Sequence, residues 1–401
     1  MEIKANLKNQ LIEKIAPFWL SQQDNINGGF YGQLDINLKS DKLAPKSGVM
    51  MSRFLWSFSS CHSLLGNKEY KVASDHAYDF LKKYLWDKKY GGIYWLVTAK
   101  GEPINTIKHI YAQSFALYGL SEYSKITSDS DALEYAKRLF HLIEKNAYNS
   151  TTGGYEEEFD QTWKQKSLSQ VSSKNPKVNY TTNTHLHLLE AYTNLYTVWP
   201  NEELLKKIHH LLRLFADHIF HSTGYCQQEF DDNWESITTG ISYGHDIETA
   251  WLLDETLSCC PIENKLAHDI RKITTSLADY CFKHGLDEKG WMLTYSDDQE
   301  GNHIKIWWVQ AEAIIGLFNA FQKSGNTEYY KAALTLSHLI QYYFVDHRSG
   351  SEWYSYINSK DSAQFSLQKH ANENNNISDA WKGPYHTTRF YLEILKRLEE
   401  K

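Results

Sequence analysis

The sequence is poor in cysteine and has no long apolar run. Its five cysteines are scattered over the chain, at Cys61, Cys226, Cys259, Cys260 and Cys281. They are too few and too dispersed for a disulfide framework, and no C-x-x-C pair of the kind that binds zinc occurs. No segment approaches the ~18 consecutive apolar residues of a membrane span, and the N-terminal residues contain no apolar signal-peptide core. We therefore expect a cytoplasmic protein without a membrane partner.

Positive charge is also scarce. The 42 Lys and Arg residues are outnumbered by 49 Asp and Glu residues, which gives a net charge of −7. This balance, without any Lys/Arg-rich run, argues against a nucleic-acid partner. Aromatic residues, in contrast, are abundant at 14%, with 13 Trp and 27 Tyr. Aromatic faces suit sugar rings, although aromatic-rich cores are also common, so the composition alone does not decide between them.

An internal repeat indicates the fold. Six segments rich in glycine and aromatic residues recur about 60 to 70 residues apart, with key glycines Gly29, Gly92, Gly154, Gly224, Gly290 and Gly350. Each segment follows an amphipathic helical pattern and precedes a more continuously apolar one. These second, apolar helices are predicted to begin near residues 50, 108, 182, 243, 305 and 382.

Twelve helices that alternate between charged and apolar types predict an all-α fold. An open solenoid would have the same period, but its apolar helices would expose a face to water. We therefore predict a closed (α/α)6 barrel formed by residues 1–401 as a single domain, with charged helices outside and apolar helices inside. The glycine-rich segments become short β-hairpins and loops at one mouth of the barrel.

Polar residues stand in the first turns of all six predicted inner helices. Because the hairpins lead into these helix N-termini, the polar side chains should converge on one cavity: Arg53, His109 with Tyr111, Asn183 with His187, His245 with Glu248, Trp308 with Glu312, and His386 with Arg389. Such an alignment of six first turns is not expected from independent structural roles.

The residue types indicate proton transfer. Two imidazoles, His245 and His386, suit proton abstraction and delivery near neutral pH. Glu248, three residues after His245, shares its helix face and is expected to orient the ring. Arg53 and a third histidine, His187, can stabilise an oxyanion that forms as a proton leaves carbon. This set predicts chemistry at the carbon next to a carbonyl, as in aldose epimerisation or isomerisation.

Each of these residues also has an ordinary structural interpretation. Arg53 enters an apolar helix and is either paired with an acid in the core or directed at a ligand. Tyr111 and Trp308 could be plain core aromatics. His185 and His187 resemble a metal pair, but residues two apart on a helix point in different directions and no third ligand follows. We therefore predict no metal site.

Two other classes of function compete with the proton-transfer hypothesis. A glycoside hydrolase needs two carboxyl groups about 5 to 9.5 Å apart across the scissile bond. The candidate acids are Asp246 and the run from Glu156 to Glu158, which is expected on a solvated or alternating strand face, and they form no clear pair. A sugar-binding protein without catalysis would have no use for two histidines at one mouth.

Several motifs together resemble one known family. They are "GGFYGQLD", "APKSGVMMSRFLWSFS", "KHIYAQSFALYGLSEY", "NTHLHLLEAYTNLYTVWP", "SYGHDIETAWLL", "KIWWVQAEAIIGLFNAF" and "WKGPYHTTR", which span nearly the whole chain. The chain resembles the N-acylglucosamine 2-epimerase superfamily, and within it the cellobiose 2-epimerases. This resemblance implies an (α/α)6 barrel, no cofactor and no metal. It also implies epimerisation at C2 of a reducing-end sugar, with the sugar as the small-molecule partner of a protein that we expect to be a monomer.

The resemblance also implies roles for individual residues. His245 and His386 match the two acid/base groups on opposite faces of C2, with Glu248 orienting His245. Arg53 matches a position that binds the enediolate oxygens. The substrate-binding set comprises Tyr111, Asn183, His187, Trp308, Glu312 and Trp381, with Trp353 at the subsite of a second sugar.

One region departs from the family pattern. The stretch between Trp353 and Trp381 is longer and richer in Asn than expected, and it should flank the outer sugar subsite. A mannose 2-epimerase or an aldose–ketose isomerase acting on monosaccharides therefore remains an alternative to a disaccharide epimerase, because both reactions pass through the same enediolate.

Overall fold

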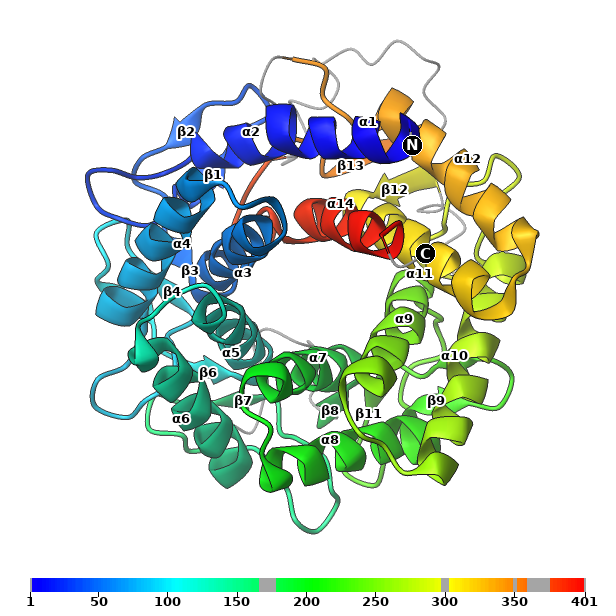
Figure 1. Cartoon of the computed structure of the whole chain (residues 1–401). Helices are drawn as coiled ribbons and strands as arrows, with labels where there is room; N and C mark the ends of the chain where they lie inside the picture. The colour runs from blue at the N-terminus through cyan, green and yellow to red at the C-terminus, as the bar shows by residue number, and fades with distance from the viewer. Residues whose placement is uncertain (1, 166–177, 297–302, 349–351, 359–375, 400–401) are drawn as a thin grey trace.

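The fold consists of two concentric rings of helices (Figure 1). The computed structural model describes residues 2–165, 178–296, 303–348, 352–358 and 376–399. Within these ranges, outer and inner helices alternate along the chain, as the repeat predicts. None of the helices in these ranges is both long enough and apolar enough to cross a bilayer.

The inner ring has six helices, and nearly all of their residues are buried because helices pack on both sides. Their first residues lie within three positions of the predicted starts. The inner helices are α3 (Gly48–Leu65), α5 (Ile110–Ser124), α7 (Thr182–Val198), α9 (Tyr243–Cys259), α11 (Trp307–Ser324) and α14 (Tyr385–Arg397).

The outer ring also has six helical rods, each with a buried apolar stripe and a solvated polar face. Three of the rods include a π-helical turn. The rods are α1–η1–α2 (Glu2–Gln10, Leu11–Ile15, Ala16–Leu20), α4–η2 (Lys68–Phe80, Leu81–Leu85), α6 (Ser130–Asn146), α8–η3 (Glu202–Leu214, Phe215–Ile219), α10 (Asn264–His284) and α12 (Thr327–Tyr343).

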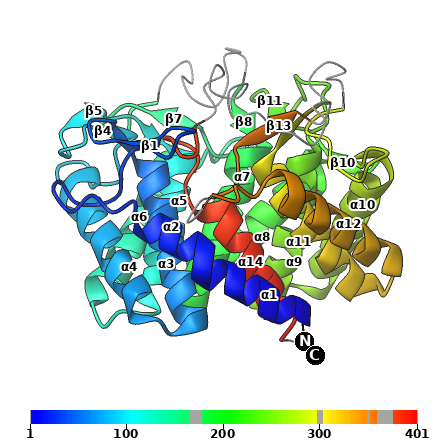
Figure 2. The ribbon, with the colours of Figure 1, turned by 90° about the horizontal axis from the view of Figure 1, so that it is seen from above.

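The ring closes between the two ends of the chain. Helix α14 packs against both α3 and α11, and the first outer rod covers α14 from outside. The Tyr391 hydroxyl donates to Oε1 of Gln10 at 2.9 Å, and Lys4 pairs with Glu399 at 2.9 Å. The two termini therefore meet at the same end of the barrel (Figure 2). The predicted closed (α/α)6 barrel is confirmed.

Short strands gather at the other end of the barrel (Figure 2). All pairs are antiparallel, and the described strands are β1 (Gln33–Leu34), β2 (Ser40–Asp41), β3 (Lys46–Ser47), β4 (Leu96–Val97), β5 (Pro103–Asn105), β6 (Lys108–His109), β7 (Glu158–Phe159), β8 (Tyr180–Thr181), β9 (Phe220–His221), β10 (Tyr225–Cys226), β11 (Glu229–Phe230), β12 (Ile304–Ile306) and β13 (Tyr356–Asn358).

The residues that lead into each inner helix pair with the loop of the next repeat. Strand β3 pairs with β4, β6 with β7, β8 with β11 and β12 with β13. Ser242, before α9, bridges to Tyr295, and Ser378, before α14, bridges back to Leu34 in the first loop. Backbone hydrogen bonds thus join all six loops into one rim, which holds the N-termini of the inner helices in register.

Tight hairpins also occur where the glycine-rich segments predict them. Bridges such as Gln23 to Phe30 and Trp86 to Ile93 close them, and Gly92 adopts a φ of +71° at the turn. A Cβ at Gly92 would lie 2.6 Å from the Trp163 ring, so the position has room only for glycine. The sixth predicted glycine, Gly350, lies outside the described residues.

The fourth residue of four inner helices ties a hairpin to the barrel. Gln113 bonds both the N–H and the C=O of Ile93, at 2.8 and 2.9 Å. Gln310 does the same with Met292, at 3.0 and 2.9 Å. In α7 and α9 the equivalent residues are His185 and Asp246, which accept from the N–H groups of Tyr155 and Cys226. This repeated device fixes the mouth of the barrel to its inner helices.

Candidate active site

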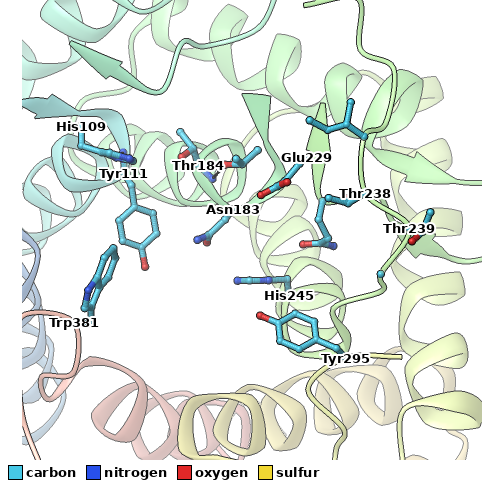
Figure 3. A pocket seen from close by; sticks show the side chains of 14 residues that line it. His109, Tyr111, Asn183, Thr184, Glu229, Thr238, Thr239, His245, Tyr295 and Trp381 are labelled. Carbon is cyan, nitrogen blue, oxygen red and sulfur yellow. Dashed lines mark hydrogen bonds between the residues drawn. The ribbon is translucent and has the colours of Figure 1, made fainter. Parts of the chain in front are cut away.

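A cavity of about 590 Å³ opens at the hairpin end of the barrel. Of the residues predicted to line it, His109, Tyr111, Asn183, His245 and Trp381 do so, and Figure 3 shows their side chains around a common space. The remaining lining residues are Thr181, Thr184, Gln228, Glu229, Ile237, Thr238, Thr239, Gly240 and Tyr295. The wall thus carries many hydrogen-bonding groups together with aromatic rings.

His386 lies below this cavity at the start of α14, after a Gly-Pro turn. Its Nδ1 donates to Oε1 of Glu312 at 2.8 Å, which leaves Nε2 as the nitrogen with a free lone pair. Burial, reinforced by the nearby Arg389 and Arg53 cations, lowers the pKa of His386 well below 6.5. The imidazole is therefore neutral near pH 7 and can accept a proton.

His245 stands across from His386 on α9. Its Nδ1 is 2.9 Å from the Ser242 hydroxyl, and burial lowers its pKa to about 4 although Glu248 opposes the shift. The centroid of the Trp308 ring lies 5.0 Å from the centroid of the His245 ring and 5.6 Å from that of the His386 ring. Trp308 therefore contacts both imidazoles.

The role expected of Glu248 differs in the structure. Glu248 lies three residues after His245, which places both on the same helix face. However, its carboxylate Oε1 accepts from the Arg389 guanidinium, and the hydroxyl of Ser242 is the group that bonds His245. Glu248 acts on His245 through its charge alone, by raising the pKa of that imidazole.

Arg53 is directed at the site and not at an acid. Its guanidinium donates to the Tyr111 hydroxyl at 2.8 Å and to the backbone carbonyl of Trp381. The group stacks over the Phe115 ring at 4.3 Å, and its buried Nε has no hydrogen-bond partner. Of the two interpretations of this residue, the structure therefore favours the one directed at a ligand.

Tyr111, His187 and Asn183 form a second polar group beside Arg53. The His187 ring packs edge-on against Tyr111 at 5.1 Å, and its Nδ1 donates to Glu190 at 2.8 Å. The buried Oδ1 of Asn183 has no hydrogen-bond partner in the part of the chain that the structure describes. A buried polar atom that lines a cavity and lacks a partner is available to a ligand.

Trp381 and Trp353, both predicted to stack on sugars, have different environments. Trp381 is 44% exposed and contacts Trp95 at the cavity wall. Trp353 is fully buried and packs on Phe390 and Tyr391 of α14. The expected second-sugar platform at Trp353 is therefore wrong. That role was implied only by the family resemblance, and in the structure this residue packs against the barrel.

Glu312 also differs from its predicted role. It is fully buried, its Oε1 accepts from His386 and Arg389, and its Oε2 accepts from Trp251 at 3.0 Å. Both oxygens are occupied, and Glu312 is not among the residues that line the cavity, so in the structure it holds His386. Burial raises its pKa, which the adjacent Arg389 opposes.

Glu248, Glu312 and His386 offer ligand atoms within 4.8 Å of one another, a spacing that would suit a metal ion. Arg389 pairs with both carboxylates, and its guanidinium therefore already supplies the positive charge at this place. His185 and His187 do not form a metal pair for a different reason. Both ring nitrogens of His185 are already bonded, Nδ1 to the Thr181 carbonyl at 2.7 Å and Nε2 to the Tyr155 N–H.

The acids considered for a hydrolase are structural. Glu157 accepts from the N–H and hydroxyl of Thr181 and from the Thr184 hydroxyl, and Glu158 is also buried. The expectation of a solvated or alternating face is therefore wrong for these two residues, which are buried in succession. Asp246 is fully buried behind Cys226.

Asp246 gives a prediction about stability. Burial raises its pKa well above 3.8, and its Oδ2 has no partner, so the folded protein holds this carboxyl protonated. Because the pKa of Asp246 is higher in the folded than in the unfolded chain, its contribution to the free energy of unfolding is most favourable below pH 4. This contribution falls as pH rises, by about 1.4 kcal/mol per pH unit, until the carboxyl ionises in the folded protein. Asp246→Asn should raise the Tm at pH 7, and this gain should shrink towards pH 4. An unchanged pH dependence in thermal unfolding would contradict the prediction.

The sequence analysis missed several residues of the site. Glu190 bonds His187, and the three-residue spacing that drew attention to Glu248 is present here too. Arg389 was noted in the first turn of its helix, yet its partners come from three other helices and no local pattern shows them. Ser242, Thr238 and Tyr295 lie in loops, where spacing carries no geometric information.

Comparison with known proteins agrees with this geometry. The model of the N-acylglucosamine 2-epimerase family matches residues 29–373. The chain belongs to this family. It is accordingly a carbohydrate epimerase or isomerase, and the family resemblance inferred from the motifs is confirmed.

Relatives within the family cover the whole chain. This chain is 38% identical over 397 residues to a cellobiose 2-epimerase of Dictyoglomus turgidum, with 99% of each chain covered. The solved structure of cellobiose 2-epimerase from Bacillus thermoamylovorans superposes with a TM-score of 0.91 at 36% identity, again over 99% of each chain. A D-mannose isomerase of Marinomonas mediterranea is more distant, at 24% identity over 96% of each chain.

Proposed function

We propose that this protein inverts C2 of the reducing-end glucose in β-1,4-linked disaccharides, converting cellobiose to glucosyl-mannose. The observation that carries the proposal is the pair of neutral imidazoles, His245 and His386, which contact the same Trp308 ring, with His245 also lining the open polar cavity. The cellobiose 2-epimerases among the relatives support the same substrate class.

In the proposed reaction, one histidine removes the C2 proton from the open-chain aldehyde. The resulting enediolate carries negative charge on its oxygens, and Arg53 stabilises this charge, while the Nε2 lone pair of His187 accepts a hydrogen bond from a sugar hydroxyl. The other histidine takes up a proton from solvent and delivers it to the opposite face of C2, and the first histidine releases its proton to solvent. Glu312 stabilises the imidazolium of His386 through its 2.8 Å hydrogen bond, and the Glu248 charge does the same for His245.

Binding is assigned to the groups around these histidines. Asn183 offers its unpartnered Oδ1 to a sugar hydroxyl, and Tyr111 is held at the wall by Arg53. Trp308 and Trp381 supply partly exposed ring faces of the kind that pack on sugars.

The setting of the reaction is also part of the proposal. We propose a monomer whose residues 1–401 act as a single catalytic domain. The five cysteines are free thiols, as in proteins of the reducing cytoplasm.

An NMR time course in D2O tests the proposal. With cellobiose as substrate, deuterium should appear at C2 and signals of glucosyl-mannose should grow. A separate sample contains mannose alone. Exchange on mannose without any on cellobiose would replace the disaccharide proposal with a mannose 2-epimerase or aldose–ketose isomerase. Release of glucose from cellobiose would indicate hydrolysis and overturn the two-histidine mechanism.

A further inference from the structure

Arg389 lies beneath the proposed catalytic histidines without reaching the cavity. It follows His386 by three residues on α14 and is fully buried. Its guanidinium is stacked between two rings, 4.9 Å from the centroid of Trp251 and 4.2 Å from that of Tyr385. These two planes fix the orientation of the fork, so its donors point in set directions.

Three carboxylates from three different inner helices converge on this fork. Nη1 donates to Glu190 of α7 at 2.6 Å. Nε donates to Oε1 of Glu312 of α11 at 3.2 Å, with Nη2 2.6 Å from the same oxygen in the ion pair, and Nη2 donates to Glu248 of α9. One guanidinium therefore bonds three carboxylates that would otherwise repel one another in a buried space.

Two of these carboxylates continue directly to histidines. Glu190 accepts from Nδ1 of His187 at 2.8 Å, and Glu312 accepts from Nδ1 of His386 at 2.8 Å. In both histidines this bond fixes the tautomer and leaves Nε2 without the proton. The chains His187–Glu190–Arg389 and His386–Glu312–Arg389 therefore meet at a single residue.

We propose that Arg389 is the positioning residue that orients His187 and His386 together, through Glu190 and Glu312. A single side chain thus sets both the group that delivers or removes the C2 proton and a group that binds the sugar hydroxyls beside it. This inference rests on the proposed function for the roles of the two histidines, but the hydrogen-bonded chains are a property of the fold.

Arg389→Lys and Arg389→Met separate the contribution of the positive charge from that of the hydrogen-bond geometry. Lysine keeps the charge but has one nitrogen, so it cannot bond Glu190 and Glu312 at the separation that Nη1 and Nη2 provide. We expect kcat to fall by about 100-fold in Arg389→Lys, since misplacing a catalytic group by ~1 Å has an effect of this size. KM should change much less, because Arg389 does not contact the sugar.

The pH profile distinguishes this role from a merely structural one. His386 is faced by Glu312, Arg389, Arg53, Glu248 and His187, and the Arg389 cation lowers its pKa. In Arg389→Met the acid limb of kcat/KM should therefore move to higher pH by about one unit, whereas in Arg389→Lys it should stay in place. Should Arg389→Met fail to fold, the kcat and tautomer results for Arg389→Lys decide the question.

Arg397→Lys is the matched control. Arg397 is a second arginine of α14 that also lies over Trp251, at 5.8 Å, but it bonds Asn319 at 3.1 Å and pairs with Glu393. The same substitution there should leave kcat and the pH profile close to those of the wild type. A folded Arg389→Lys with wild-type kcat, or an equal loss in Arg397→Lys, would overturn the proposal.

A spectroscopic readout does not depend on turnover. In ¹⁵N-histidine spectra, His187 and His386, assigned with the His187→Asn and His386→Asn variants, should both show the Nδ1–H tautomer. Arg389→Lys should change at least one of them, and Arg397→Lys neither. Unchanged tautomers in Arg389→Lys would contradict the inference even if the protein acted on another sugar, so failure of the proposed substrate and failure of this inference are distinguishable.

Discussion

Replacing His386 by asparagine is expected to lower the rate of epimerisation by about 10²–10⁴-fold, the usual contribution of a general acid or base. Asparagine is similar in reach and keeps an amide N–H that can donate to Glu312, the partner of His386 at 2.8 Å. The buried carboxylate therefore stays paired and the fold should persist. What is lost is the nitrogen that takes up or releases the C2 proton. Initial rates with cellobiose, measured beside circular dichroism and the Tm, check this result.

The His386→Asn variant should retain one partial reaction. His245 is still present, so it can remove the C2 proton from the epimer whose proton faces it and exchange that proton with solvent. Deuterium should then enter one epimer without conversion to the other. His209→Asn is the control, because this histidine is exposed and contacts the Pro261 carbonyl on the outer ring. Normal epimerisation by His386→Asn would remove His386 from the acid/base pair.

Replacing His245 by alanine is expected to have an effect of similar size for the same reason. The residue is held by Ser242 at 2.9 Å and contacts no charged partner by hydrogen bond, so its removal leaves no buried ion unpaired. We therefore expect a folded variant with a Tm near that of the wild type. Initial rates with cellobiose again provide the measurement, and His268→Ala, an exposed position on α10, is the control.

The two variants should be complementary in the exchange experiment. If His386→Asn exchanges deuterium into one of the two epimers, His245→Ala should exchange it into the other, because the two bases approach opposite faces of C2. Starting the reaction separately from cellobiose and from glucosyl-mannose reveals which is which. Exchange into the same epimer in both variants would mean that one histidine serves both faces.

The fold could be predicted from the sequence because each repeat has the same order of outer helix, hairpin and inner helix. The six glycine-rich turns and the two kinds of helix recur often enough that closure follows from the need to bury the apolar helices. The rim of strand pairs could not be predicted. Pairs such as Lys108 with Phe159 join residues about 50 positions apart, and two-residue strands have no periodicity that a sequence pattern can reveal.

The site residues were predictable where the distance of a residue from the N-terminus of its inner helix decides whether it lies near the mouth of the barrel. Tyr111, Asn183 and His245 were located in this way and line the cavity. Arg53 and His386 were located in the same way and lie next to it: Arg53 bonds Tyr111, and His386 contacts the Trp308 ring that also meets His245. Partners were much less predictable than positions.

Glu248 and Glu190 illustrate the limit. Each follows a histidine by three residues, yet Glu190 bonds its histidine and Glu248 bonds Arg389. The difference arises from side-chain orientation and from an arginine more than a hundred residues away, and neither is visible in local spacing. Trp353 failed as a prediction for a related reason, since the face of a hairpin that meets the barrel depends on tertiary packing.

The closure of the ring has a consequence for how the protein acquires its structure during synthesis. The first outer rod, α1–η1–α2, leaves the ribosome first, but its partner α14 comes last in the order of the helices. The indole N–H of Trp19, for example, donates to Glu352 at 2.6 Å, a contact that spans 333 positions. Until then only part of the apolar side of this rod is covered: Trp19 already meets Phe54 of α3, but Leu11 and Ile15 lie on the part of the rod that α14 covers. Such long-range contacts slow folding and leave an intermediate prone to association. A nascent chain of this protein should therefore need a chaperone most at the moment before its last helix emerges.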